Sequence, residues 1–125
     1  MLTDMDATAT VGVRDMAAAR EFYSNVLGLK PIDTDDGDML LYRSGNTRVF
    51  VYRSDYAGTN QATAITWDVA DQFDAIVAAL QAKGARFEHY EMDGMRREDD
   101  IHIARHMKIV WLKDPDGNIL NINGT

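Results

Sequence analysis

The hydrophobic positions along the chain describe one structural unit twice. A β-compatible run at residues 7–13 leads into a segment with apolar residues at helical spacing, which ends at Gly28. Further along, residues 65–69 have the character of a strand, and a second amphipathic segment follows and ends at Gly84. Because the matching landmarks are separated by the same interval, the pattern predicts an internal repeat.

Each predicted helix has a start signal and a stop signal. Asp15 and Asp71 precede the two apolar patterns, and a carboxylate at that position accepts hydrogen bonds from free amides of the first turn. Asp74 follows Asp71 by three residues and strengthens the second signal. Gly28 and Gly84 tolerate positive φ and suit the residue after a helix. We therefore expect two capped helices.

Short β-compatible runs follow each helix. They lie at residues 31–34, 39–43 and 48–53 in the first half and at residues 86–90, 107–112 and 119–122 in the second. Turn-forming residues at 44–46 and 114–118 precede the last strand of each half. The pattern indicates an α+β fold of two tandem βαβββ modules, at about residues 7–54 and 62–123, in a single domain spanning residues 1–125.

The second module differs from the first by an insertion at about residues 91–105. This segment is polar and contains glycine, so we expect a long loop at the end of a strand. Loops of this length on rigid scaffolds often carry function.

Alternation within the strands predicts which side chains are buried. One helix covers one face of its sheet, so two modules side by side form a curved mixed sheet whose concave face lines a cavity. The side chains expected beneath the helices are Val11, Val13, Ile65, Trp67, Val69, Leu120 and Ile122. Those expected to face the cavity are Thr8, Thr10, Ala64, Thr66, Asp68, Asn121 and Asn123.

Composition and charge narrow the possible partners. A chain of 125 residues with 46% hydrophobic residues is of single-domain size. Its net charge of -7 repels phosphate backbones and anionic lipids, so we expect neither nucleic acid nor a membrane as a partner. There is no cysteine, no apolar leader and no apolar run long enough for a membrane span, so we expect a cytoplasmic protein.

Three motifs together resemble a known superfamily. They are the strand ending Val13-Arg14-Asp15-Met16, the run from Phe22 to Leu29, and the turn and strand from Asp114 to Leu120. In order and spacing they resemble the vicinal oxygen chelate superfamily, which includes glyoxalase I, extradiol dioxygenases and bleomycin-resistance proteins. The resemblance covers nearly the whole chain and implies the paired βαβββ fold and a homodimer.

Metal-dependent members of this superfamily hold a divalent ion with His, Glu or Gln from the first and last strands of each module. The flanking motifs place these positions at Thr8, Phe50, Ala64 and Asn121, with Val49 as the alternative to Phe50 if the hairpin register differs. None of these side chains is an imidazole or a carboxylate. We therefore expect no metal ligands and no cofactor.

Candidate ligand-binding residues follow from the predicted cavity. Polar candidates come from the cavity face, aromatic candidates from nearby strands, and His102 from the insertion over the cavity mouth. The full set is Thr8, Thr10, Tyr42, Phe50, Tyr52, Thr66, His102, Trp111 and Asn121. For catalysis, His102 and Asp68 are the candidate acid or base. The run at residues 114–118 is interpreted as a structural turn, because it lacks the later glutamate of a calcium loop.

These observations favour a binding protein of the bleomycin-resistance type. The expected ligand is a small aromatic or cationic organic molecule, which the protein sequesters without a metal. The alternative is a glyoxalase-like or dioxygenase-like enzyme of the same fold, a lyase or an isomerase, with a non-standard or absent metal site. The sequence leaves open whether the protein is an enzyme.

Overall fold

A computed structural model describes residues 1–32 and 37–125, and within them each half of the chain contains the predicted unit. The first module consists of β1 (Thr8–Val13), α1 (Met16–Glu21), a π-helical turn η1 (Phe22–Val26), β2 (Lys30–Ile32), β3 (Met39–Ser44) and β4 (Thr47–Arg53). The strand predicted at residues 31–34 is described only as far as residue 32.

The second module has the same order with one addition. Its elements are β5 (Thr63–Asp68), a 3-10 turn η2 (Ala70–Gln72), α2 (Phe73–Ala82), β6 (Arg86–Glu88), β7 (Arg96–Glu98), β8 (Ile101–Ala104), β9 (Met107–Lys113) and β10 (Ile119–Gly124). None of the helices in residues 1–32 and 37–125 has the length and apolar character of a membrane span.

The insertion is more ordered than the sequence suggested. Instead of a long loop, it contains the hairpin of β7 and β8, and β8 pairs with β9. Asp99 occupies the tight turn with a φ of 51°. The polar composition of this segment conceals its strands in the sequence, and β8 is held in the sheet by β9, which follows it in the chain.

One of the two predicted N-caps is confirmed. The Asp15 carboxylate accepts a hydrogen bond of 3.0 Å from the amide of Ala18. Asp71 is not a cap: the second helix is preceded by η2, and the amide of Ala70 donates to Asp68 at 3.1 Å instead. The prediction for Asp71 was wrong because Ala70 has a φ of 51°, which turns the chain before the helix begins.

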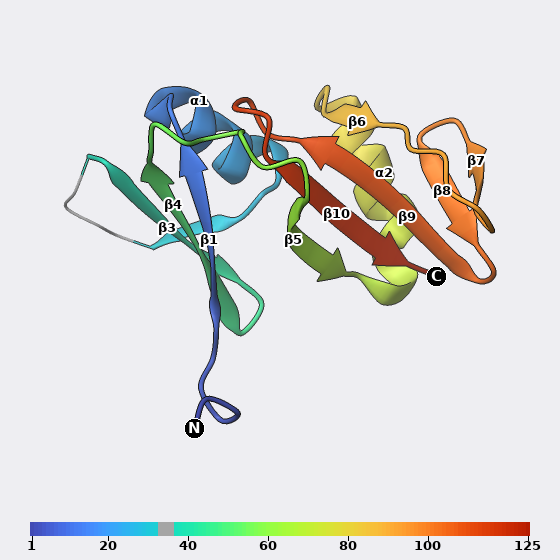
Figure 1. Ribbon diagram of the computed structural model, residues 1–125, viewed down its shortest axis with the longest axis horizontal. Helices are drawn as coiled ribbons and strands as arrows, with labels where there is room; N and C mark the ends of the chain where they lie inside the picture. The colour runs from blue at the N-terminus through green and yellow to red at the C-terminus, as the bar shows by residue number, and fades with distance from the viewer. Residues whose placement is uncertain (33–36) are drawn as a thin grey trace.

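The strands form two sheets rather than one continuous sheet (Figure 1). Within the described residues, the first has the order β1-β4-β3-β2 and the second the order β5-β10-β9-β8-β7, with β6 also on β9. The two modules meet where β1 and β5 lie side by side in opposite directions. Both helices lie behind the sheets in this view, so the other faces of both sheets are open.

The face alternation predicted from the sequence holds for most residues, but Trp67 and Val69 are only partly buried beneath the helices, and Asn121, predicted to face the cavity, is buried. Val11, Val13, Ile65, Leu120 and Ile122 are buried in one core shared by both modules. The exposed residues between them face the open side of the sheets. The modules therefore pack together through their helix-covered faces, which removes apolar surface of both from water.

A buried polar contact fixes one module against the other. The Tyr23 hydroxyl donates to Asp114 Oδ2 at 2.8 Å, and the Asn118 side chain donates to the Gly12 carbonyl at 2.8 Å. Asp114 is fully buried and also accepts from the amides of Asp116 and Asn118. These bonds give the turn at residues 114–118 the structural role expected of it.

Candidate functional site

A hollow on the open face lies where the two first strands meet. It has a volume of about 520 Å³. Thr8, Ala64, Thr66 and Asp68 contribute to its lining from β1 and β5, and Arg48 contributes from β4. The strands adopt this arrangement because Val11 and Ile65 are held in the core, which turns the alternate residues outward.

A smaller pocket of about 180 Å³ lies at the other end of the junction. Thr10 and Tyr52 line it, and Ala64 is common to both hollows. Four of the sequence-predicted ligand residues, Thr8, Thr66, Thr10 and Tyr52, are therefore brought together along the junction of β1 and β5.

Two aromatic rings flank this junction. Phe50 and Tyr52 stack with ring centroids 5.8 Å apart and an interplanar angle of 9°. Phe50 is half-buried and pairs in register with Thr10, whereas Val49 is buried in the core. The register that places Phe50 on the open face is therefore the observed one, and the stacked pair offers a flat apolar surface beside the hollow.

Tyr42 does not lie on the open face with Phe50 and Tyr52. It is only 1% exposed, and its hydroxyl lies 3.0 Å from Ser24 Oγ beneath the helix-covered face of the sheet. Its ring stacks on Tyr23 in the core. The structure thus corrects the predicted position of Tyr42, since Leu41 and Arg43 alternate with it on the open face.

Asn121 and Trp111 lie on the open face of the second sheet, outside the hollow. They are paired in register on β10 and β9, and Asn121 is 6% exposed. The Asn121 amide donates to the Val110 carbonyl at 3.4 Å and its oxygen accepts from Asn123 at 3.3 Å. Trp111 packs edge-on against Tyr90 and His102.

His102 is part of this packing rather than a free acid or base. Its side chain is fully buried, and Nε2 accepts a hydrogen bond of 2.9 Å from the amide of Tyr90. Nδ1 lies 3.3 Å from the carbonyl of Ile109. Because both ring nitrogens are occupied by the backbone, His102 ties the loop at Tyr90 to β8 and β9 and has no free nitrogen to act as an acid or base.

Because His102 is buried, we expect the folded protein to be less stable at acidic pH. Burial lowers the pKa of His102 below its ordinary value of 6.5. As the pH falls below about 6.5, the unfolded chain takes up a proton that the folded chain does not, so stability decreases. We expect the melting temperature to fall by roughly 3–6 °C between pH 7 and pH 5.5 through this residue.

Thermal unfolding of three proteins measures this effect. At pH 7, His102→Gln should have a lower melting temperature than the native protein. Between pH 7 and pH 5.5 its melting temperature should fall much less than that of the native protein. His106→Gln, which changes an exposed residue, should show the same fall as the native protein. An equal decline in all three proteins would contradict a buried neutral His102.

Charges of both signs lie at the hollow, although the net charge of the chain is negative. Arg48 and Asp68 contribute one charge each to its lining. Arg43 lies opposite Arg48 in register, and Lys30 lies opposite Arg43. This row of cations crosses three strands, and the sequence analysis missed it because its members are distant along the chain.

The residues at the family's metal positions do not fit a divalent ion. Thr8 and Ala64 line the hollow, Phe50 flanks it and Asn121 lies on β10, so these four positions supply two neutral oxygens at most. Across residues 1–32 and 37–125, no group of three or more His, Cys, Asp or Glu side chains is placed to hold a metal.

Several proteins of known structure have a similar fold. FosX, a fosfomycin resistance protein from Listeria monocytogenes, is 11% identical with a TM-score of 0.74, covering 100% of this chain and 95% of its own. Lactoylglutathione lyase from Agrobacterium tumefaciens is 16% identical with a TM-score of 0.71, covering 99% and 96%. At these identities the likeness shows the fold alone.

A third neighbour and a family model agree with them. The glyoxalase/bleomycin resistance protein/dioxygenase from Alicyclobacillus acidocaldarius is 19% identical with a TM-score of 0.73, covering 97% of this chain and 91% of its own. Comparison with curated proteins finds no match. The family model matches residues 6–122. The chain therefore belongs to the Glyoxalase/Bleomycin resistance protein/Dioxygenase superfamily.

Proposed function

We propose that this protein binds a small, flat aromatic molecule on the open face of its two sheets, without a metal ion. The observation that carries the proposal is the stacked Phe50–Tyr52 pair on β4, together with the threonine and alanine side chains of the hollow and the smaller pocket. Tyr52 lines the smaller pocket, and Phe50 lies on β4 between Tyr52 and Arg48 of the hollow. Side chains of this kind offer apolar surface and hydroxyl groups but no strong metal donors.

The residues that line the hollow limit which ligand charge it favours. Among the residues that the structure describes, one arginine and one aspartate contribute to it, so these charges balance. This balance gives a cationic ligand no general advantage, although Asp68 offers one carboxylate to a suitably placed ammonium group. An aromatic ligand with polar substituents therefore fits the hollow better than a ligand that is merely cationic.

The enzyme alternative depends on Asp68. This carboxylate lines the hollow next to Thr66, and Oδ1 accepts from the amide of Ala70. His102 cannot assist it, because both of its ring nitrogens are engaged. Catalysis, the homodimer and the cytoplasmic location stay predictions. The dimer is tested by measuring the mass of the protein in solution and comparing it with the 14.0 kDa of one chain.

Calorimetry with matched naphthalene probes tests the binding function. We expect 2-naphthol to bind the native protein, and Phe50→Leu to weaken it about fivefold because the stacking surface is lost. Phe50→Tyr keeps the ring and should keep the affinity. The anionic 2-naphthoate and the cationic naphthylmethylamine show which charge the hollow prefers.

Two results would contradict the proposal. One is the absence of binding by all three probes and by a cationic glycopeptide of the bleomycin class. The other is binding that Phe50→Leu leaves unchanged.

A further inference from the structure

A second cavity lies between the two modules, where the start of β2 and the turn between β3 and β4 face α2 and β5. Its volume is about 310 Å³, and it is separate from the hollow on the open face. Apolar side chains from both modules form much of its wall: Leu27, Leu29, Val69, Ile76, Leu80 and Ile122. The two modules thus leave an apolar space between them where their cores meet.

Cations complete the wall of this cavity. Lys30 and Arg43 line it, lie opposite each other on β2 and β3, and are both exposed. Among residues 1–32 and 37–125, no acidic side chain lines it. The cavity is therefore apolar with positive charge on one side, which is the reverse of the negative charge of the chain as a whole.

A hydrogen bond separates the cavity from the hollow. The Trp67 indole donates to Ser44 Oγ at 2.8 Å, and Trp67, Ser44 and Gly45 line both spaces. The indole therefore stands between the two sites.

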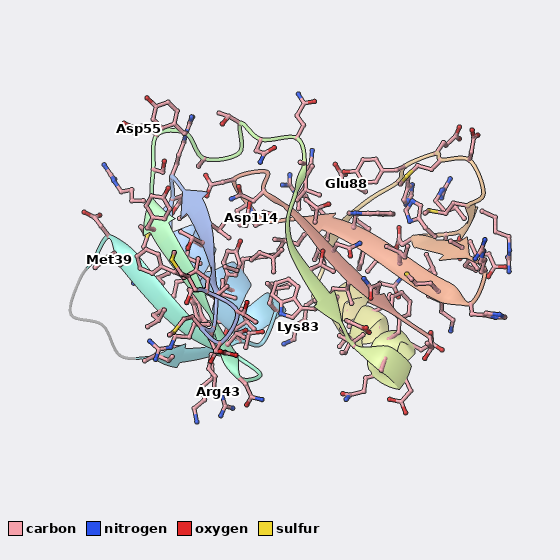
Figure 2. All side chains as sticks on the ribbon, turned by 60° about the horizontal axis from the view of Figure 1, so that its bottom comes forward. Met39, Arg43, Asp55, Lys83, Glu88 and Asp114 are labelled. Carbon is pink, nitrogen blue, oxygen red and sulfur yellow. The ribbon has the colours of Figure 1, made fainter. Side chains whose placement is uncertain are left out.

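The cavity is framed by the ends of both helical segments. Lys83, just after α2, donates to the carbonyl of Asn25 in η1 and so joins the segments that carry Leu80 and Leu27. Figure 2 shows Lys83 between the two modules and Arg43 at the end of the first module. The ammonium group of Lys83 also offsets the negative end of η1, which would otherwise disfavour an anion nearby.

From this arrangement we infer that the cavity binds a small amphipathic carboxylate. The hydrocarbon part contacts the apolar wall, and the carboxylate accepts hydrogen bonds from Lys30 and Arg43. Known ligand pockets have volumes of about 300–1,000 Å³, so this one suits a short chain or a single ring. This inference is independent of the aromatic ligand proposed for the open face.

Three eight-carbon probes separate the charge from the hydrocarbon. Calorimetry should show octanoate binding most tightly, octan-1-ol more weakly, and octylammonium most weakly, because only octanoate complements the cations. Lys30→Gln and Arg43→Gln should each weaken octanoate roughly two- to fivefold, and the double variant about tenfold. Both residues are exposed, so these variants should fold.

Two controls place the binding site. Arg105→Gln removes the same charge from the turn between β8 and β9 and should leave octanoate affinity unchanged. Phe50→Leu should also leave it unchanged, because Phe50 does not line the cavity. In a Trp111→Phe background, Trp67 is the remaining tryptophan, and octanoate should change its fluorescence.

The inference is overturned if octan-1-ol binds as tightly as octanoate. It is also overturned if the double variant binds octanoate as the native protein does, or if octanoate does not bind at all. Loss of octanoate binding in Phe50→Leu would place the carboxylate on the open face instead.

Discussion

Asp114→Ala is expected to lower the free energy of unfolding by about 4 kcal/mol. The Asp114 carboxylate is fully buried and accepts hydrogen bonds from the Tyr23 hydroxyl, from the Asn118 side chain and from the amides of Asp116 and Asn118. Alanine leaves these donors without their acceptor, and an unsatisfied buried donor costs about 1–3 kcal/mol. Denaturant unfolding measures the loss.

The same turn provides a matched control. Asp116 Oδ2 is buried and has no hydrogen-bond partner among the described residues, so Asp116→Ala removes a carboxylate that contributes little. We expect it to change stability by less than about 1 kcal/mol. If both alanine variants were equally stable, the turn would not depend on the Asp114 network.

Tyr23 extends this prediction to alkaline pH. Burial, reinforced by Asp114, raises the pKa of Tyr23 well above its ordinary value. The folded chain therefore keeps the proton above pH 10, where the unfolded chain releases it, and stability falls as the pH rises beyond that point. Tyr23→Phe should reduce this alkaline loss, whereas Tyr52→Phe, which changes an exposed ring, should not.

Gly58→Ala should be the second severe substitution, with an expected loss of about 3 kcal/mol. Gly58 lies in the segment between the modules and has a φ of 69°, which alanine adopts only with strain. A β-carbon there would lie 1.9 Å from the Asp116 carbonyl oxygen. That carbonyl cannot retreat easily, because the amide of Asp116 is bound to Asp114.

Gly45→Ala isolates the strain from the clash. Gly45 has a similar φ of 58°, but an added β-carbon would meet nothing within 4 Å. We expect it to cost about 1 kcal/mol, from the backbone conformation alone. Thermal unfolding should therefore rank native, Gly45→Ala and Gly58→Ala in that order, and equal losses would show that Gly58 does not pack closely on the turn.

Together these variants test how the modules are joined. Tyr23 and Gly58 belong to different parts of the chain, yet both contact the turn at residues 114–118. Figure 2 shows Asp114 in the region where the two modules meet. The turn therefore fixes the relative position of the sheets, and with it the hollow between β1 and β5.

The sequence by itself determined the repeated unit and the faces of most strands. Gly28 and Gly84 adopt positive φ, Asp15 caps its helix, and the residues alternating with Val11 and Ile65 face outward. These features depend on local chemistry and on a period of two, both of which can be read from neighbouring residues.

The sequence also determined what the family's metal positions contain. The flanking motifs that locate these positions are local, so the positions can be identified without the fold. The side chains found there are neutral: Thr8, Phe50, Ala64 and Asn121. Where these side chains lie relative to one another did not follow. Asn121 is engaged on the second sheet, apart from the hollow that Thr8 and Ala64 line.

Only the tertiary structure decided the roles of Tyr42 and His102. The run from Met39 to Ser44 carries three consecutive apolar residues before Tyr42, so alternation alone could not assign a face to its ring. Both ring nitrogens of His102 are engaged by backbone groups of Tyr90 and Ile109, which reach it through the pairing of β8 with β9 and the fold of the preceding loop.

The cavity between the modules was likewise invisible in the sequence. Its cations come from β2 and β3 and its apolar wall from both halves of the chain. The physical reason is that local patterns fix what each segment forms and which face it buries, whereas a cavity depends on how closely two packed faces approach each other. That approach is set by long-range contacts such as the bond from Tyr23 to Asp114.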